Sequence, residues 1–376
     1  MNLPPIKVMV LGLRGFPDVQ GGVEKHAEHL YPLLAKSGCQ VDVITRSPYM
    51  PREHRSWRGI TFHRLWAPRV TGIEALIHTI LGVLYAAIKR PDVLHIHAIG
   101  PAIVTPLARF MRLRVVVTHH GPDYDREKWG NMARRLLQLG EEWGMRYANK
   151  RIVISKVINQ LVKEKYSIDT VVIPNGVTFP VIPSSTSALE KFGLDKRRYV
   201  LLVSRFVQEK RHLDLINAFK EAHLKRWKLV LVGDADHPDE YSRKIKSISK
   251  QSPDIVMTGF QSGVSLSELY ANAGIFVLPS SHEGLPIAML EALSYGLPIL
   301  ASDIPANLEV GLPISDYFPL GDISCLARML KKFAKEGRRE ELNRDNNKLI
   351  SDNYNWDKIA SRTLVVYQQA ANVASK

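Results

Sequence analysis

Two series of short β-branched runs that alternate with helical segments constrain the fold of this chain most strongly. The first series has apolar runs at 7–11, 41–45, 93–96, 114–118, 151–155 and 171–174, with helical spacing at 23–36 and 73–89. The second has runs at 199–203, 227–232, 255–258, 275–279 and 298–301, with a helix near 213–219. Strands that alternate with helices form parallel sheets with crossover helices, so the sequence predicts two Rossmann-like, doubly wound α/β domains.

The domain boundary is predicted at a Pro- and Ser-rich stretch, 179–187, whose composition suits a linker. We expect a first domain over 1–180 and a second over 190–355. A helical pattern from Trp356 to Ala371 lies beyond the second sheet. A chain of 376 residues is long enough for two cores, and a cleft between domains is a usual place for a ligand.

The charge balance favours an anionic partner. Lys and Arg number 51 against 37 Asp and Glu, a formal net charge of +14. Nucleotides, sugar phosphates, acidic lipid head groups and nucleic acid all fit that sign. The two cysteines, Cys39 and Cys325, lack the spacing of a zinc or redox site, which favours a reducing, cytoplasmic setting.

No targeting or membrane segment is predicted. Residues 1–5 lack a basic leader region, and 6–13 has the composition of a first core strand. The apolar stretch 70–88 is interrupted by Glu74 and His78, so we expect a buried helix there rather than a transmembrane span.

Ligands of open parallel sheets lie beyond the carboxyl ends of the strands, where this chain has four unusual clusters. The first contains Gly12, Gly15 and the run Gln20-Gly-Gly-Val-Glu24, before a predicted helix. Glycine there lets a phosphate approach main-chain N–H groups, although an ordinary turn uses glycine as well.

The second cluster consists of histidines at the ends of two strands, His95 and His97, then His119 and His120. We expect His120 to act at a reacting sugar. A metal site built from these histidines is not expected, because no carboxylate shares their spacing.

The third cluster holds Arg205 and Lys210, in the stretch from Ser204 to His212. A planar guanidinium and a compact ammonium can bind one diphosphate from two sides, as stabilisation of a leaving group requires. A solvated run of charges is the alternative.

The fourth cluster contains Glu283 and Glu291, which flank a loop and the start of a helix, with Pro286 in the first helical turn. If the whole interval were helical, the carboxylates would be separated by about 12 Å along the axis and roughly 80° around it. That separation excludes the pair of a retaining glycosidase, about 5 Å apart. We therefore expect two contacts to one long ligand.

A nucleotide-sugar is such a ligand. Sugar hydroxyls would bind Glu283 and ribose hydroxyls Glu291, with the diphosphate over main-chain N–H groups of Gly284, Leu285 and Ile287. The alternative is a solvent-facing loop followed by a helix with an exposed acid.

These motifs together resemble retaining glycosyltransferases of the GT-B superfamily, family 4, over nearly the whole chain. The resemblance rests on the Glu-X7-Glu segment from Glu283 to Glu291, Arg205 with Lys210, Ile173-Pro-Asn-Gly-Val177, and Val256-Met-Thr-Gly-Phe260 ahead of Leu269-Tyr270. It implies a nucleoside-diphosphate-sugar donor, no cofactor and no metal. It also implies that 356–376 crosses back to the first domain.

The resemblance assigns a role to each matching residue. Glu283 would bind the donor sugar, Glu291 the ribose, and Arg205 with Lys210 the diphosphate. Main chain near Phe260 would contact the base, Gly22 the phosphates, and His120 the sugar near the reacting carbon.

A narrower resemblance concerns bacterial rhamnosyl- and other sugar transferases of surface polysaccharides. It rests on Leu11 to Pro17, Gly21 to Glu24 and Asp123 to Gly130. One departure is Ala235, where family members often have Gly. The Asp234-Ala-Asp236 stretch fits a metal-binding pattern, but we interpret it as a strand-end loop.

The predicted function is transfer of a sugar, with retention, to a glycan or lipid-linked acceptor. Two alternatives remain: an epimerase or phosphorylase of the same architecture, and a non-catalytic basic protein at a membrane surface. Nucleic-acid binding is not expected without a recognisable module. The sequence does not specify the sugar, the base, the acceptor or the oligomeric state.

Overall fold

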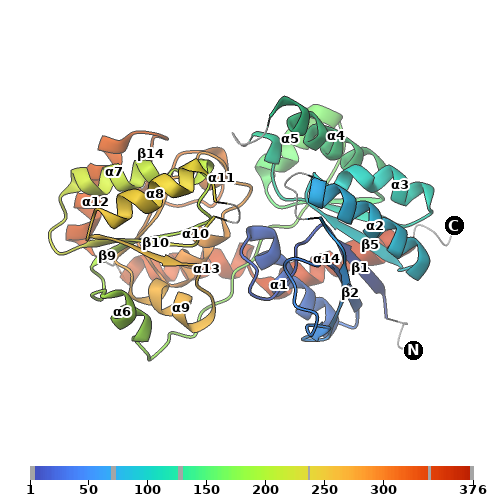
Figure 1. Cartoon of the computed structure of the whole chain (residues 1–376), viewed down its shortest axis with the longest axis horizontal. Helices are drawn as coiled ribbons and strands as arrows, with labels where there is room; N and C mark the ends of the chain where they lie inside the picture. Colours follow the sequence, from blue (N-terminus) through green and yellow to red (C-terminus); the bar gives the residue numbers. More distant parts are fainter. Residues whose placement is uncertain (1–4, 69–72, 126–129, 236–237, 338–339, 373–376) are drawn as a thin grey trace. The chain divides into compact units, whose positions relative to one another are not determined.

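A computed structural model describes the chain except for residues 1–4, 69–72, 126–129, 236–237, 338–339 and 373–376 (Figure 1). Its internal contacts divide it into two compact units. The first unit consists of Met1–Asn175 with Trp356–Lys376, and the second of Gly176–Asn355.

The first unit is built on an eight-stranded sheet in the order β3-β4-β2-β1-β5-β6-β7-β8. Its strands are β1 (Lys7–Leu11), β2 (Gln40–Arg46), β3 (Ser56–Trp57), β4 (Ile60–Leu65), β5 (Val93–His97), β6 (Val115–His119), β7 (Lys150–Val153) and β8 (Val171–Val172). Its helices are α1 (Gly22–Lys36), α2 (Ile73–Lys89), η1 (Pro101–Val104), α3 (Thr105–Phe110), η2 (Asp123–Asp125), α4 (Asn131–Tyr147), α5 (Lys156–Tyr166) and α14 (Trp356–Asn372).

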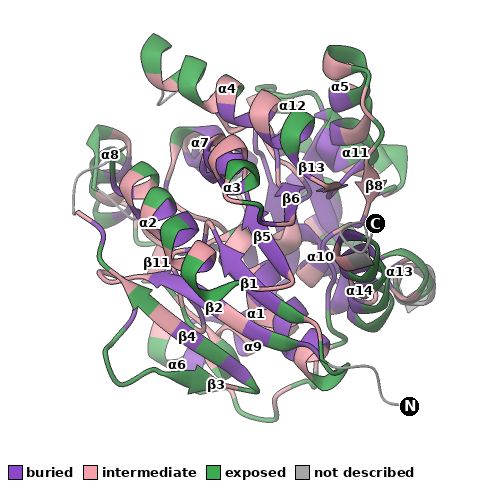
Figure 2. Cartoon of the chain, turned by 90° about the vertical axis from the view of Figure 1, so that its right-hand side faces the viewer, coloured by how far each residue is buried: buried purple, intermediate pink, exposed green. Residues whose placement is uncertain are grey.

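The pairing of the first sheet is parallel except between β3 and β4. Its central strands β5 and β6 are buried along their whole length (Figure 2), because helices cover both faces. Such strands are continuous β-branched runs, which is why the sequence pattern located them. After β1 the chain adds strands on one side of the sheet, and after β5 it adds them on the other side. The switch point of the topology therefore lies between β1 and β5.

Helix α14 packs against α1 and thereby completes the core of the first unit. Its Tyr367 is fully buried, and the phenolic oxygen lies 2.6 Å from Nδ1 of His95 on β5. The prediction that the last helix returns to the first domain is confirmed.

The second unit is built on a six-stranded parallel sheet in the order β11-β10-β9-β12-β13-β14. Its strands are β9 (Tyr199–Val203), β10 (Lys228–Val232), β11 (Ile255–Gly259), β12 (Ile275–Leu278), β13 (Ile299–Ser302) and β14 (Tyr317–Phe318). Its helices are α6 (Ser187–Phe192), η3 (Gln208–Lys210), α7 (His212–Ala222), α8 (Glu240–Lys250), α9 (Gly263–Asn272), α10 (Ile287–Ser294), α11 (Pro305–Leu308), η4 (Ile314–Asp316), α12 (Ile323–Glu336) and α13 (Glu340–Asn353). Its switch point lies between β9 and β12, and the predicted pair of doubly wound α/β domains is confirmed.

The second unit begins ahead of the predicted linker. Val177 pairs with Asn355 in an isolated parallel bridge, and the Val177 N–H donates to the carbonyl of Tyr354 over 2.8 Å. These contacts attach the first residues after Asn175 to the C-terminal residues of the second unit.

Helix α2 differs from the buried helix that its apolar composition predicts. Its buried side contains Glu74, His78 and Thr79, whereas Leu76, Ile80 and other large apolar side chains are exposed. The helix buries these polar residues together with Gly82, Val83 and Ala86, and leaves five larger aliphatic side chains exposed. No helix in the described part of the chain is long and apolar enough to cross a bilayer.

Candidate functional site

The glycine-rich loop after β1 is closely packed against the end of β5. At Gly12, φ is +100° and a Cβ would lie 2.3 Å from the carbonyl oxygen of His97, so only glycine fits. At Gly22, the first residue of α1, a Cβ would have no heavy atom within 4 Å. Side-chain crowding therefore does not require glycine at position 22.

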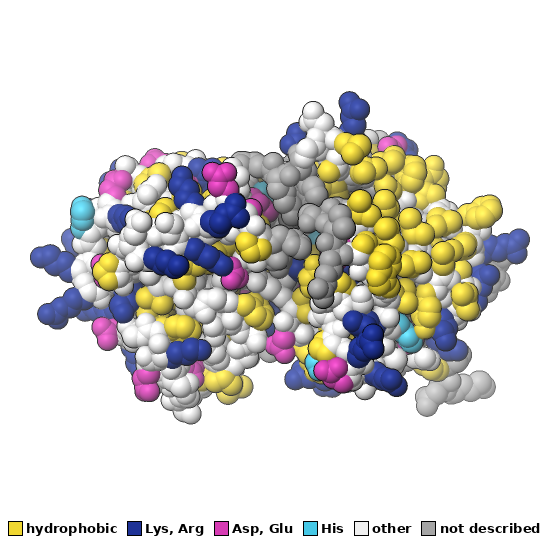
Figure 3. Space-filling view, viewed as in Figure 1, with side chains coloured by type: hydrophobic (Ala, Val, Ile, Leu, Met, Phe, Trp, Pro, Cys, Tyr) yellow, Lys and Arg dark blue, Asp and Glu magenta, His cyan; other side chains and the backbone are white. Residues whose placement is uncertain are grey.

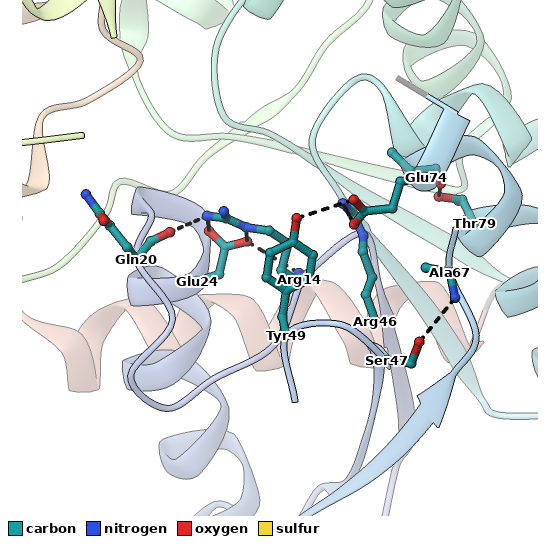
Figure 4. A network of polar contacts seen from close by, with 10 residues as sticks. Arg14, Gln20, Glu24, Arg46, Ser47, Tyr49, Ala67, Glu74 and Thr79 are labelled. Atoms are coloured by element: carbon teal, nitrogen blue, oxygen red, sulfur yellow. Dashed lines mark hydrogen bonds and ion pairs between the residues drawn. The ribbon is translucent and has the colours of Figure 1, made fainter. Parts of the chain in front are cut away.

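Two ion pairs hold this loop and the neighbouring strand β2 (Figure 4). Arg14 Nε lies 3.1 Å from Glu24 Oε1, and another nitrogen of the same guanidinium donates to the carbonyl of Gln20. Arg46 Nη1 lies 3.1 Å from Glu74 Oε1. Both pairs are largely buried; the first holds the loop between β1 and α1 against the start of α1, and the second joins β2 to α2.

The predicted histidines form a hydrogen-bonded cluster at the ends of β5 and β6. His97 Nδ1 lies 2.9 Å from His120 Nε2, and the Tyr31 hydroxyl contacts both His97 and His95. The ring centroid of His26, from α1, lies 5.1 Å from that of His120. His120 is the partly exposed member, whereas His26, His95 and His97 are buried.

All four imidazoles of this cluster are neutral at physiological pH. Burial, reinforced by the neighbouring histidines, lowers the pKa of His95 and of His120 to about 3. The pKa values of His26 and His97 are lowered well below the usual range for the same reasons. His120 can therefore exchange hydrogen bonds with a sugar hydroxyl, but it carries no positive charge there.

Three of these histidines have the geometry of a possible metal site. One ring nitrogen each of His26, His97 and His120 lies within 4.8 Å of the others, the only such group among the described residues. His26, which belongs to α1, is not among the residues predicted from the sequence. The Nδ1 atom of His26 lies 2.9 Å from Asn175 Oδ1, so one ring nitrogen of His26 already has a polar partner.

His119 is directed away from this cluster and pairs with a carboxylate instead. Its Nε2 lies 2.7 Å from Glu141 Oε1 of α4, and both side chains are fully buried. Burial of Glu141 raises its pKa, but hydrogen bonds from His119 and Tyr166 outweigh that effect and lower the pKa to about 2. The carboxylate partner of His119, Glu141, follows 22 residues later in the sequence and belongs to α4.

In the second unit, Lys210 and Glu283 form an ion pair at the switch point of the sheet. Lys210 Nζ lies 2.5 Å from Glu283 Oε1, and the side chains are only 18% and 9% exposed. Burial raises the pKa of Glu283, but the ammonium of Lys210 more than offsets this and holds it below its usual value. Glu283 is therefore an ionised hydrogen-bond acceptor.

Main-chain hydrogen bonding brings these two loops together. Lys210 ends η3 after β9, and Glu283 follows β12, which is the neighbour of β9 in the sheet. The Ser281 N–H donates to the carbonyl of Glu209 over 2.8 Å. The sequence predicts separate contacts for Lys210 and Glu283, whereas the structure pairs them.

Glu291 lies inside α10 and is held by an aromatic residue of α9. The buried Tyr270 hydroxyl donates to Glu291 Oε2 over 2.9 Å, and its ring stacks on Tyr295 with centroids 5.3 Å apart. Burial, and then the negative charge of Glu291, raise the pKa of Tyr270 well above its usual value. Tyr270 thus remains a protonated donor.

Helix α10 begins later than the sequence predicts. Pro286 is the N-cap rather than part of the first turn, and Ile287 is the first helical residue. Glu283 therefore lies in the preceding loop, with Gly284 and Leu285. The two carboxylates belong to different structural elements, and each has its own partner.

The remaining predicted residues lie in loops that follow strands. Arg205 is two residues beyond β9 and partly buried, whereas Phe260 follows β11 and is 42% exposed. Asp234 follows β10 and pairs with Lys246 over 2.7 Å. Asp236, and part of the stretch from Asp123 to Gly130, lie outside the described residues.

Comparison with known proteins decides the family. A family model described as glycosyl transferase 4-like domain matches residues 21–176, and one described as glycosyl transferases group 1 matches residues 185–312. Together these two matches cover most of the chain. The chain is a GT-B glycosyltransferase.

Similar sequences and structures cover three quarters or more of this chain. An uncharacterised glycosyltransferase of Methanocaldococcus jannaschii is 25% identical, over 96% of this chain and 97% of the relative. The amylovoran biosynthesis glycosyltransferase AmsD of Erwinia amylovora is 27% identical, over 75% and 77%. The solved sucrose-phosphate synthase of Thermosynechococcus elongatus has a TM-score of 0.82 at 20% identity, over 98% and 100% of the two chains.

Three side chains of this glycosyltransferase's site had no role in the sequence analysis: His26, Glu141 and Tyr270. His26 and Glu141 lie on helices, where a single polar residue carries no signal of a distant partner. Tyr270 formed part of the family motif, so the motif identified the residue but not its contact with Glu291. Roles for the predicted site residues remain predictions.

The neutral histidines predict that the first domain of this glycosyltransferase loses stability in mild acid. An unfolded histidine has a pKa of about 6.5, above the lowered values in the fold. The unfolded state therefore binds more protons below that pH. Each such histidine lowers the free energy of unfolding by up to about 1.4 kcal/mol per pH unit as the pH falls from 6 towards 4.

Urea unfolding at pH values between about 7.5 and about 5, a range that spans the titration of an unfolded histidine, checks this expectation. The exposed His54 supplies a control, since His54→Gln should leave the profile unchanged. An unfolding free energy that stays constant over this range would contradict the expectation.

A second expectation concerns Tyr270 as a positioning residue. Tyr270→Phe removes the hydroxyl that orients Glu291 but keeps the stacked ring. We expect KM for the sugar donor to rise about 5- to 10-fold, in line with the loss of one hydrogen bond to a charged group, with kcat nearly unchanged. Steady-state kinetics measure both constants, and a fall in kcat at constant KM would refute a role in positioning.

Proposed function

We propose that the enzyme transfers a sugar, with retention of configuration, from a nucleoside-diphosphate-sugar to a hydroxyl of a glycan or lipid-linked acceptor. The observation that carries this proposal is the ion pair of Lys210 and Glu283 at the switch point of the second sheet. This pair offers a cation for a diphosphate beside an anion for sugar hydroxyls.

The donor would extend from Glu283 to Glu291. Glu283 is ionised and accepts hydrogen bonds from the sugar, and Glu291, oriented by Tyr270, accepts them from the ribose. Main-chain N–H groups of Gly284, Leu285 and Ile287 would face the diphosphate, since the start of a helix favours an anion.

The remaining donor contacts would come from two other loops. The base would contact main chain near Phe260. From the first domain, Gly22 would contact the phosphates.

The reaction would depend on stabilisation of the leaving group. The bond between the anomeric carbon and the diphosphate oxygen breaks, and the acceptor oxygen bonds to that carbon on the same face. The acceptor proton passes to the departing diphosphate. Lys210 and Arg205 would neutralise the charge that develops there, which is the largest contribution expected for such a transfer.

His120 would position the sugar by hydrogen bonding. Its neutral imidazole and its contact with His97 orient the ring without adding charge. No metal or other cofactor enters this scheme, since two cationic side chains supply the charge. Activity should therefore survive dialysis against EDTA.

Similar proteins support the class of donor and suggest a pathway. The solved HepE of Anabaena, with a TM-score of 0.75 and 16% identity over 99% and 100% of the chains, is in complex with UDP-glucose. The relative from Erwinia amylovora acts in amylovoran biosynthesis. We therefore propose surface-polysaccharide synthesis in the cytoplasm, with peripheral association at the inner membrane leaflet where a lipid-linked acceptor is presented.

The test combines a donor panel with an acceptor extract. Uridine, guanosine, adenosine and thymidine diphosphate sugars are incubated, in EDTA, with and without a membrane lipid extract, and release of nucleoside diphosphate is measured. We expect one donor to be consumed only when acceptor is present, with retained anomeric configuration by NMR. Interconversion of sugars without acceptor would favour an epimerase, and transfer to inorganic phosphate a phosphorylase.

A further inference from the structure

The outer face of α2 in the first domain is apolar along its length. Ile73, Leu76, Ile80, Leu84 and Ile88 are between 37% and 80% exposed. At 100° per residue, these five positions fall within an arc of about 120°. A helix at the surface of a globular protein normally presents polar residues on such a face.

The inner side of α2 holds buried polar residues together with the small apolar residues Val83 and Ala86. Glu74 is paired with Arg46 and accepts a hydrogen bond from Tyr49, while His78 and Thr79 are buried. The apolar face is therefore not needed to anchor the helix on the sheet. It remains available for a partner outside the chain.

The apolar face continues onto the neighbouring helices. Phe110 at the end of α3 is 85% exposed, and Met132 at the start of α4 is 79% exposed. Figure 3 shows a broad hydrophobic area on the side of the first unit where Figure 1 labels α2, α3 and α4, and α3 contacts both other helices. We call this area the α2 face. Contiguous apolar surface of this kind marks an interaction site.

Basic residues surround the most exposed apolar side chains of the α2 face. Lys89 and Arg90 follow Ile88, and Arg109 and Arg112 flank Phe110. The Arg90 guanidinium donates to the carbonyl of Met111 over 2.9 Å, which ties the ends of α2 and α3 together. Between residues 73 and 114 there are five Lys and Arg against two acids, of which Glu74 is paired and buried.

We propose that the α2 face docks the enzyme on an anionic lipid bilayer. The apolar side chains would enter the boundary between head groups and acyl chains, and the basic residues would contact anionic head groups. Helix α2 has only 17 residues, and no described helix is able to span a bilayer, so it would lie in the plane of the membrane. A second copy of the chain fits less well, because pairing two such faces would bring their basic residues together.

Vesicle flotation tests this proposal without using the transferase reaction. We expect the protein to float with phosphatidylcholine vesicles that contain about 30 mol% phosphatidylglycerol, and not with pure phosphatidylcholine. Ile88→Ser with Phe110→Ser should weaken binding about 10-fold or more. Lys89→Gln with Arg112→Gln should weaken it as well, and binding should fall in about 0.5 M NaCl.

Matched controls separate membrane docking from other causes. Val264 and Ile314, in the second domain, are 63% and 82% exposed, so their replacement by Ser removes comparable apolar surface elsewhere and should leave binding unchanged. Absence of flotation, equal binding to neutral vesicles, or normal binding of the Ile88/Phe110 variant would overturn the proposal. So would a dimer, seen by sedimentation velocity, that the same variant converts to a monomer. Failure here would remove the proposed membrane association and leave the proposed sugar transfer itself untouched.

Discussion

Lys210→Ala is expected to lower kcat by about 10² to 10³ while the protein remains folded. In the proposed reaction, Lys210 stabilises the charge that develops on the departing diphosphate, and loss of one such group typically has an effect of this size. The substitution also leaves Glu283 buried without its ammonium partner, so the pKa of that carboxyl should rise.

A matched control distinguishes this effect from loss of any lysine. Lys246 also forms an ion pair, with Asp234, but both side chains are about two-fifths exposed, at 40% and 42%. Lys246→Ala should leave kcat within about twofold of the wild-type value, since exposed pairs contribute little. Initial rates of nucleoside diphosphate release measure both variants. Equal rates for Lys210→Ala and wild type would exclude Lys210 from the reaction.

Tyr367→Ala is expected to destabilise the first domain by about 3–5 kcal/mol, the usual cost of truncating a large buried aromatic side chain. Tyr367 connects α14 to the sheet, because its ring is fully buried and its hydroxyl contacts His95. The replacement leaves a cavity and removes one polar partner of a buried imidazole.

Two further substitutions divide this loss into its parts. Tyr367→Phe keeps the ring and should cost about 1–2 kcal/mol, the value of one buried hydrogen bond. Val365→Ala, on the exposed side of α14 at 48% exposure, should change the unfolding free energy by less than about 0.5 kcal/mol. Hydrogen exchange of amides in β5 and α1 reports the first domain alone, and unchanged protection in Tyr367→Ala would contradict the account of α14.

The central strands were predictable because burial on both faces gives continuous β-branched runs. Positions 7–11 and 199–203 match β1 and β9 residue for residue. Strand β4 was missed, since Ile60–Leu65 alternates in burial and contains Thr61, His63 and Arg64. Helix α2 was found, but its orientation was not, because composition does not show which side of a helix faces the sheet.

The candidate site was predictable as a set of loops but not as a set of contacts. Strand ends locate Lys210 and Glu283 on neighbouring strands, yet their ion pair depends on a main-chain hydrogen bond between Ser281 and Glu209. The contact of His26 with the histidine cluster depends on how α1 packs, across long separations in sequence. Such contacts follow from tertiary packing, which local patterns do not encode.

The central claim is that the second domain binds a nucleoside diphosphate beside Lys210 and Glu283. Isothermal titration of uridine, guanosine, adenosine and thymidine diphosphate into the wild-type enzyme and the two lysine variants tests it most directly. We predict that at least one of these ligands binds with single-site stoichiometry, that Lys210→Ala weakens its affinity about 10-fold or more, and that Lys246→Ala does not. Absence of binding by every nucleoside diphosphate, or equal affinity of the Lys210→Ala variant and the wild type, would contradict the claim.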